Sequence, residues 1–336
     1  MAIQSDTVTQ TGISLQQRAL GVIKTRNATL VFLILVASVV LTVIQPRFLS
    51  EGNLSAVIIG MVYDLLMAMG MTLVMILGGV DLSVGSVLAL SGVTTTVLLS
   101  DKVGINLPIP FAILAGLVVA AICGCLNGFA VARLKIAPFI VTLGMLTIAR
   151  GIVTVTTSGW FISGLPDGYV QIGQGSFLGI IPYSVLIAFI ILIAFNYLLK
   201  HWKSLNQVFY IGFNPAAAAL SGQRVLLVTF FGYVISSLLA GVAAIFMTSR
   251  LAMGYFQFGQ GAELNAIAGA VIGGASFAGG KGDLVGTFLG ILLLAIIQNG
   301  FTLLGGQPSW LGIVSGAIVF IAIALDGYRR RKETRD

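Results

Sequence analysis

Side chains that could do chemistry are sparse in this sequence, and their types favour binding over catalysis. Charged residues make up 9% of the 336 residues, and the chain has one histidine and two cysteines. Cys123 and Cys125 are two positions apart in an apolar run, so they face different sides of a helix and favour neither a disulfide nor a metal site. A membrane enzyme would need a cluster of catalytic groups, and the single histidine, His201, does not supply one.

Two ionisable residues, Asp64 and Arg150, lie inside long apolar runs. Charges at membrane depth are rare and usually functional, so one interpretation gives these residues a role in gating or in contacting a polar solute. The other interpretation is structural, either an ion pair between helices or side chains that extend to the membrane surface. The sequence leaves both interpretations open.

Three uncharged polar residues also interrupt apolar runs: Asn127, Thr142 and Asn265. Each brings hydrogen-bonding groups into surroundings where a polar group without a partner is costly. We predict that these side chains face the path of a hydrogen-bonding solute.

The chain contains no nucleotide-binding loop. Such a loop needs the pattern G-x-x-x-x-G-K-[ST]. The nearest approach is at Gly280-Lys281, but Ala275 occupies the position of the first glycine, and Gly282 follows the lysine. We therefore expect this chain to bind no cofactor, and any ATP hydrolysis with its Mg²⁺ to take place on a separate subunit.

The elements that hold these residues are predicted to be membrane helices. The chain is 57% hydrophobic with a mean hydropathy of +1.05, whereas a soluble domain carries about 25% charged residues. About 20 mostly apolar residues cross a bilayer as a helix. We predict an all-α polytopic membrane protein with about ten transmembrane helices, at 28–45, 59–79, 83–99, 109–132, 137–156, 178–199, 225–248, 262–278, 284–304 and 310–326.

Small residues recur at helical spacing within these spans. Gly116, Ala120, Gly124 and Gly128 are four positions apart, and the same spacing joins Gly269 to Gly273 and Gly286 to Gly290. Such spacing lets helix backbones approach closely, so we predict packing positions, with a pore-lining role as the alternative.

The basic residues indicate the orientation. If the N-terminus is cytoplasmic, 14 of the 18 lysines and arginines fall in inside segments, and only Arg47, Lys102 and Arg250 fall in outside loops. This bias predicts an even number of spans with both termini cytoplasmic. It also accounts for the net charge of +7 without a nucleic-acid partner. The predicted organisation is a cytoplasmic tail at 1–27, a transmembrane domain at 28–326 with a cytoplasmic loop at 200–224, and a basic cytoplasmic tail at 327–336.

The most distinctive local pattern is the turn between the second and third spans, Gly-Gly-Val-Asp-Leu-Ser-Val-Gly at 78–85. Gly78 and Gly79 permit a tight turn. Asp81 can cap the next helix, where a negative charge suits the positive helix end. Taken alone, the pattern is also consistent with a tight helix hairpin that has no further role.

Extended to GGVDLSVGSVLAL, this segment closely resembles the signature of the permeases of monosaccharide ABC importers, the ribose, galactoside and xylose type. Further segments resemble that family in the same order, from about Phe48 to Gly327: Asn127-Gly128, LKIAPFIVTLG at 134–144, Arg150-Gly151, ELNAIA at 263–268, VIGG at 271–274 and AGGKG at 278–282.

The resemblance implies a multi-pass permease of the bacterial inner membrane that moves a monosaccharide or related polyol. Its implied partners are an ATPase subunit that binds ATP and Mg²⁺, an extracytoplasmic sugar-binding protein and a second permease subunit, identical or related. If the solute is a sugar, the polar residues Asn127, Thr142 and Asn265 become candidate sugar contacts. The residues that carry the signature turn are Gly78, Gly79, Asp81, Ser83 and Gly85.

The long inside loop carries the signals of a short helix. Asn214 suits the N-cap, Pro215 suits the first helical position, and Gly222 can end the helix. Between them the predicted helix contains Ala217, Ala218, Leu220 and Ser221. In the resembled family this loop contacts the ATPase; without a partner it would be a helix on the membrane surface.

The same loop departs from the family pattern. The usual Gly-Gly-Asn is Gly212-Phe213-Asn214 here, and the usual Gly-Arg pair is absent. The choice of ATPase is therefore left open.

Two further features have more than one interpretation. The outside loop at 157–177 holds Trp160, Phe161, Pro166, Asp167 and Tyr169, which suit either an interfacial anchor or a docking surface for a binding protein. The segment at 81–86 resembles the one at 283–287, which hints at an internal repeat of the kind found in transporters.

The main alternative function is a self-sufficient secondary sugar transporter or channel. An ion-coupled carrier usually has a relay of intramembrane carboxylates. Asp64 stands alone in its span, so the sequence favours the permease over the carrier.

Overall fold

The computed structural model describes residues 26–103 and 105–307, together with scattered positions between 310 and 327. The expected tail up to residue 25, much of the expected span at 310–326 and the basic tail from 328 lie outside the described residues. The elements are α2 (Arg26–Ile44), η1 (Pro46–Leu49), α3 (Glu51–Ile76), α4 (Val84–Leu99), α5 (Ile109–Ala132), α6 (Pro138–Thr157), α7 (Asp167–Gln174), β1 (Ser176–Phe177), β2 (Ile181–Pro182), α8 (Tyr183–His201), α9 (Lys203–Phe213), α10 (Pro215–Leu220), α11 (Val225–Leu251), α12 (Ala262–Gly273) and α13 (Leu284–Leu303).

Helices account for nearly all of the regular structure. In the described part of the chain, seven are long and apolar enough to cross a membrane: α2, α3, α5, α6, α8, α11 and α13. Two shorter apolar helices, α4 and α12, lie within the third and eighth expected spans. The prediction of an all-α polytopic membrane protein is therefore confirmed.

Three expected spans differ from the structure by five or more residues at one end. The span at 59–79 is α3, which begins at Glu51; the span at 178–199 is α8, which begins at Tyr183; and the span at 262–278 is α12, which ends at Gly273. Helix α12 has 12 residues and is about 18 Å long, well short of a hydrocarbon core of about 30 Å. It stops at Gly273, and Gly274 follows with φ 122°, a conformation that side chains disfavour. The segment before it, 252–261, is not helical either. The apolar composition continues past Gly274, so hydropathy alone extends the expected span to residue 278.

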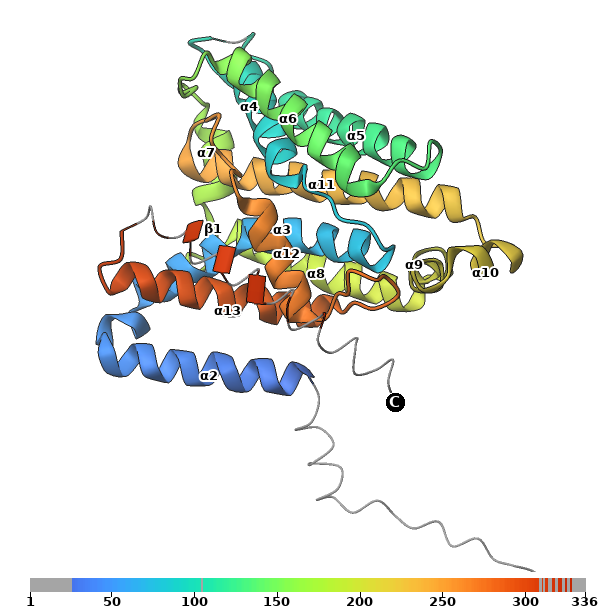
Figure 1. Ribbon diagram of the computed structural model, residues 1–336. Helices are drawn as coiled ribbons and strands as arrows, with labels where there is room; N and C mark the ends of the chain where they lie inside the picture. The colour runs from blue at the N-terminus through green and yellow to red at the C-terminus, as the bar shows by residue number, and fades with distance from the viewer. Residues whose placement is uncertain are drawn as a thin grey trace, which may run out of the picture.

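Helix α3 occupies the centre of the bundle. Every residue from Leu65 to Ile76 is buried, because α8, α11, α12 and α13 pack around it. Figure 1 shows α3 between α11 and α13, with α2 at the periphery along α13. A helix that is apolar on all sides suits such a central position.

The small residues at helical spacing are packing positions, as predicted. A Cβ added at Gly124 would lie 2.7 Å from Cα of Val234, and one at Gly128 would lie 2.6 Å from the carbonyl oxygen of Phe230. These contacts join α5 to α11. In the same way, a Cβ at Gly290 would lie 2.3 Å from the carbonyl oxygen of Gly269, where α13 meets α12.

The two ends of the bundle carry different structures. Helix α7 packs on the C-terminal end of α11, where Gly173 lies against the backbone of Arg250. The short helices α9 and α10 lie at the other end of α11 (Figure 1). Helix α10 is the predicted loop helix, whereas α9 was not predicted. Its apolar side, with Val208 and Ile211, is buried against the bundle.

Candidate functional site

The signature turn leaves α3 through two glycines, as the sequence predicts. Gly78 has φ +83°, and its N–H donates to the carbonyl oxygen of Met75 at 2.9 Å. The N–H of Gly79 donates to Val74 at 3.0 Å, which closes the last turn of the helix. A side chain on Gly79 would collide with Oη of Tyr233 at 2.3 Å, so the turn is pressed against α11.

Asp81 is fully buried at the centre of this turn. Its Oδ1 accepts from the Ser83 backbone N–H at 3.0 Å and from Oγ of Ser83 at 2.6 Å, and its Oδ2 accepts from Oγ of Ser236 at 2.9 Å. Burial raises the pKa of the Asp81 carboxyl, and the hydrogen bonds from Ser83 and Ser236 act in the opposite direction. The expected capping role is wrong in detail, because Ser83 occupies the N-cap position of α4. Asp81 instead ties the turn to α11.

Two of the three candidate solute contacts support this turn. Nδ2 of Asn127 donates to Oγ of Ser83 at 2.9 Å, and Oγ1 of Thr142 donates to the carbonyl oxygen of Val80 at 3.2 Å. Both side chains are fully buried. The structure thus brings α5 and α6 onto the signature turn through the polar groups that the sequence singled out.

The third candidate, Asn265, lies in a half-buried polar cluster formed by α3, α12 and α13. Its Nδ2 donates to Oδ2 of Asp64 at 3.1 Å, and its Oδ1 accepts from Nε2 of Gln298 at 3.3 Å. Gln298 was not singled out from the sequence, although it also interrupts an apolar run.

Arg150 does not pair with Asp64. Its guanidinium donates to the carbonyl oxygens of Phe256 and Phe258, the latter at 2.9 Å. Both acceptors belong to the non-helical segment 252–261. Backbone carbonyls that are not in a helix need donors at membrane depth, and Arg150 supplies two of them. These contacts favour the structural interpretation of Arg150, and a role in gating or in contacting a solute stays a prediction.

Helix α10 has the caps that the sequence predicts. Oδ1 of Asn214 accepts from the N–H of Ala217 at 3.0 Å, Pro215 is the first helical residue, and Gly222 follows the helix with φ +80°. Leu220 is 91% exposed, and Phe213 before the helix is 82% exposed. Two large apolar side chains therefore stand at this end of the molecule with little protein around them.

The aromatic residues of the expected outside loop divide into two groups. Trp160 and Phe161 are exposed and free to contact either headgroups or a docking protein. Tyr169 is fully buried, and its Oη lies 2.6 Å from Oγ1 of Thr248 in α11. Burial raises the pKa of the Tyr169 phenol. Tyr169 is therefore not a surface anchor; it holds α7 on α11.

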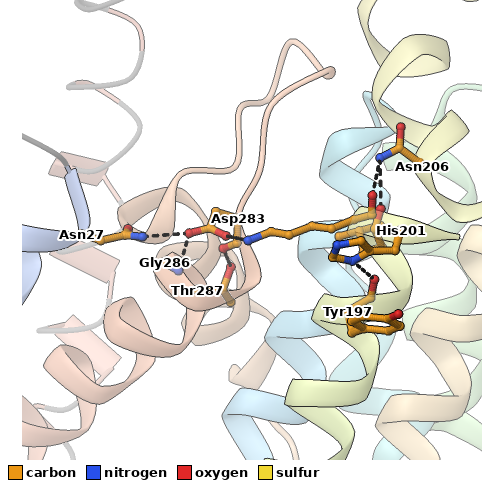
Figure 2. A network of polar contacts seen from close by, with 9 residues as sticks. Asn27, Tyr197, His201, Asn206, Asp283, Gly286 and Thr287 are labelled. Carbon is orange, nitrogen blue, oxygen red and sulfur yellow. Dashed lines mark hydrogen bonds and ion pairs between the residues drawn. The ribbon is translucent and has the colours of Figure 1, made fainter. Parts of the chain in front are cut away.

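Asp283 caps α13 at the same end as α10, and Figure 2 shows the network around it. Oδ2 of Asp283 accepts from the N–H of Gly286 at 3.0 Å and from Nδ2 of Asn27 at 2.9 Å, and Lys200 forms an ion pair with Oδ1 at 3.7 Å. This residue therefore links α2, α8 and α13. Asp81 and Asp283 both precede a helix, as the hint of a repeat suggests, but only Asp283 is an N-cap.

Comparison with known proteins identifies the family. A family model described as "Branched-chain amino acid transport system / permease component" matches residues 53–323. The ribose import permease protein RbsC of Bacillus subtilis is 36% identical over 293 residues, which cover 86% of this chain and 88% of the relative.

Two further relatives match over similar lengths. The RbsC protein of Escherichia coli K12 is 34% identical over 312 residues, which cover 91% of this chain and 94% of the relative. The L-arabinose ABC transporter permease protein AraH of Azospirillum brasilense is 32% identical over 303 residues, with 90% and 87% covered. No solved structure matches significantly. The chain belongs to the family of ABC-importer permeases that includes these ribose and arabinose proteins, and it is a transport subunit rather than an enzyme.

Proposed function

We propose that this chain forms the membrane path for a monosaccharide or related small polyol, driven by a separate ATPase. The observation that carries the proposal is the exposed, fully capped helix α10 on a chain that lacks a nucleotide-binding loop. Such a chain needs an external source of work, and α10 with its exposed Leu220 offers a surface that an ATPase groove can hold. The sugar class is supported by the names of the relatives, ribose and arabinose permeases.

The proposed topology has ten spans with both termini in the cytoplasm of a bacterium and the chain in its inner membrane. The distribution of lysine and arginine supports this topology, because the basic residues near α9 and α10 assign that end of the bundle to the cytoplasm. Lys200 and Arg224 flank these two helices and Lys203 begins α9, whereas Arg250 lies at the opposite end, next to α7.

The proposed partners are the ATPase subunit with its ATP and Mg²⁺, an extracytoplasmic sugar-binding protein and a second permease subunit, identical or related. The translocation path would lie between the two permeases and be lined mainly by residues from α3 to α6, α12 and α13. Asn127, Thr142 and Asn265 are the proposed sugar contacts. Partial exposure supports Asn265 best, because Asn127 and Thr142 are buried against the signature turn.

One observation favours a second candidate, a secondary transporter. Asp64 is a carboxylate at membrane depth whose hydrogen-bond partner among the described residues is the Asn265 amide. An ion-coupled carrier could use such a group.

Uptake into proteoliposomes separates the two candidates. The permease is reconstituted with its ATPase and binding protein and offered a panel of labelled pentoses, hexoses and inositol. We expect uptake of one sugar class that requires ATP and the binding protein. Uptake by the permease alone, driven by a proton or sodium gradient, would contradict the proposal and support the carrier.

A further inference from the structure

Three backbone segments meet directly at the end of the bundle that carries α10. They are the last turn of α3, the last turn of α9 and the loop 274–283 between α12 and α13, which extends toward α9 in Figure 1. The N–H of Gly280 donates to the carbonyl oxygen of Ile76 at 2.8 Å. A Cβ on Gly212 would lie 1.7 Å from that same oxygen and 2.6 Å from the nitrogen of Gly280.

A second glycine of the loop tightens the contact. Gly279 has φ +82°, and a Cβ at that position would lie 2.5 Å from the carbonyl oxygen of Gly212 and 3.1 Å from Cα of Gly78. No side chain separates the three segments at this point. We call the contact of Ile76, Gly212 and Gly280 the glycine junction.

Each segment of the glycine junction leads to a different part of the molecule. From Gly212 the chain reaches the N-cap of α10 within two residues. From Ile76 it enters the signature turn, where Asp81 holds α11. From Gly280 it reaches Asp283, which caps α13 and is bound by Asn27 of α2.

We propose that the glycine junction passes the movement of α10 directly to the signature turn and to the loop before α13. The inference rests on the proposed function, in which an ATPase moves α10. Backbones in close contact have no rotatable side chain between them that could absorb a displacement, and packed protein is stiff. Movement at Gly212 must therefore shift Ile76 and Gly280. Gly212 is a positioning residue and contacts neither substrate nor nucleotide.

The junction also gives a reason for glycine at position 212, which lies in α9 and needs no unusual backbone conformation. Alanine at position 212 would force the backbone of α9 away from the carbonyl oxygen of Ile76 by more than about 1 Å, because packed interiors leave no room for an extra methyl group. The helix itself would tolerate alanine better than glycine. The substitution therefore disturbs the contact rather than α9.

The test compares Gly212→Ala with Gly60→Ala in the complete transporter with its ATPase and binding protein. Gly60 is a matched control, since it lies in α3 with no heavy atom within 4 Å of an added Cβ. We expect Gly212→Ala to retain co-purification of the ATPase and basal ATP hydrolysis. Stimulation of hydrolysis by the sugar-loaded binding protein, and uptake at matched abundance, should fall about tenfold, a typical size for coupling between sites.

The outcomes separate this inference from the function on which it rests. Stimulation and uptake by Gly212→Ala within about twofold of wild type, while a proline in α10 abolishes both, would overturn the junction alone. A fall in co-purification and abundance together would assign Gly212 a merely structural role and would also overturn it. If the wild-type complex shows no ATP-driven uptake, the proposed function fails.

A second measurement avoids the risk that the variant does not fold. Amide hydrogen exchange of the wild-type permease is followed with and without the ATPase and ATP. The Gly280 amide is a direct reporter, because it donates across the junction. We expect exchange to change in peptides covering 76–82 and 276–283. A change confined to 210–222 would contradict the proposal.

Discussion

At the scale of single residues, the charged side chains of the buried Asp81 and the half-buried Arg150 are matched by hydrogen bonds from side chains or to the backbone. Asp81 accepts from three neutral donors, and Arg150 donates to two carbonyl oxygens more than 100 residues away. A buried charge is tolerated when its hydrogen-bonding groups are matched in this way. Ionisable residues here are therefore part of the scaffold around the path as well as candidates for lining it.

Two substitutions at Asp81 should distinguish the stability that its hydrogen bonds contribute from the stability that its side-chain volume contributes. Asp81→Ala leaves the donors on Ser83 and Ser236 without an acceptor, at a cost of about 1–3 kcal/mol for each unpaired group. Asp81→Asn keeps the volume and one acceptor oxygen, so we expect a smaller loss. Thermal unfolding of the purified permease measures both. Asp167→Ala, at an exposed position, is the control, and equal stability of all three variants would contradict this account.

At the scale of elements, helix α10 is held by its caps rather than by its length. It has six residues, and an isolated helix of that size is not stable in water. Three features stabilise this short helix: the Asn214 cap, the proline at its first position and the buried Ala218.

Proline substitutions in α10 should differ by position. At position 217 proline removes the N–H that donates to Oδ1 of Asn214, and losing this cap destabilises the helix by about 1 kcal/mol. At position 219 the proline ring would clash with the carbonyl oxygen of Pro215 one turn earlier, and such a clash destabilises a helix by about 3 kcal/mol. We expect sugar uptake to fall more for Ala219→Pro than for Ala217→Pro, at matched membrane abundance. Ala219→Ser keeps the N–H and should transport normally. Full uptake by Ala219→Pro would refute the coupling role of α10.

Sequence reasoning located elements better than contacts. Helix α5 has the predicted bounds, because Pro108 and Arg133 flank a continuous apolar run. Helix α12 does not, because its apolar run continues past the break at Gly274. The pairing of Asn265 with Asp64 could not be predicted, since 201 residues separate them and only the packing of α12 on α3 brings them together.

At the scale of the whole molecule, the orientation in the membrane is open to a direct test. Leu220 and Trp160 are 91% and 73% exposed and lie at opposite ends of the bundle. In a chain whose two native cysteines are replaced, we expect a membrane-impermeant maleimide to label Trp160→Cys in intact cells and Leu220→Cys only after lysis. Reporter fusions at Lys332, which lies outside the described residues, and within 160–175 should likewise report opposite sides. Labelling of Leu220→Cys in intact cells would contradict the proposed topology, and labelling of Leu220→Cys alone would indicate the inverted one.

The contact between Arg150 and the segment 252–261 also constrains how the protein is made. Arg150 is synthesised 106 residues before Phe256, whose carbonyl oxygen accepts from its guanidinium. During that interval, α6 carries an unmatched charge and cannot settle among lipid tails. We expect α6 to remain beside the insertion machinery until the segment 252–261 has been made and can accept from Arg150. A chain truncated after Leu251 would then be degraded faster than the full chain in a pulse-chase experiment, and equal half-lives would show that α6 inserts unaided.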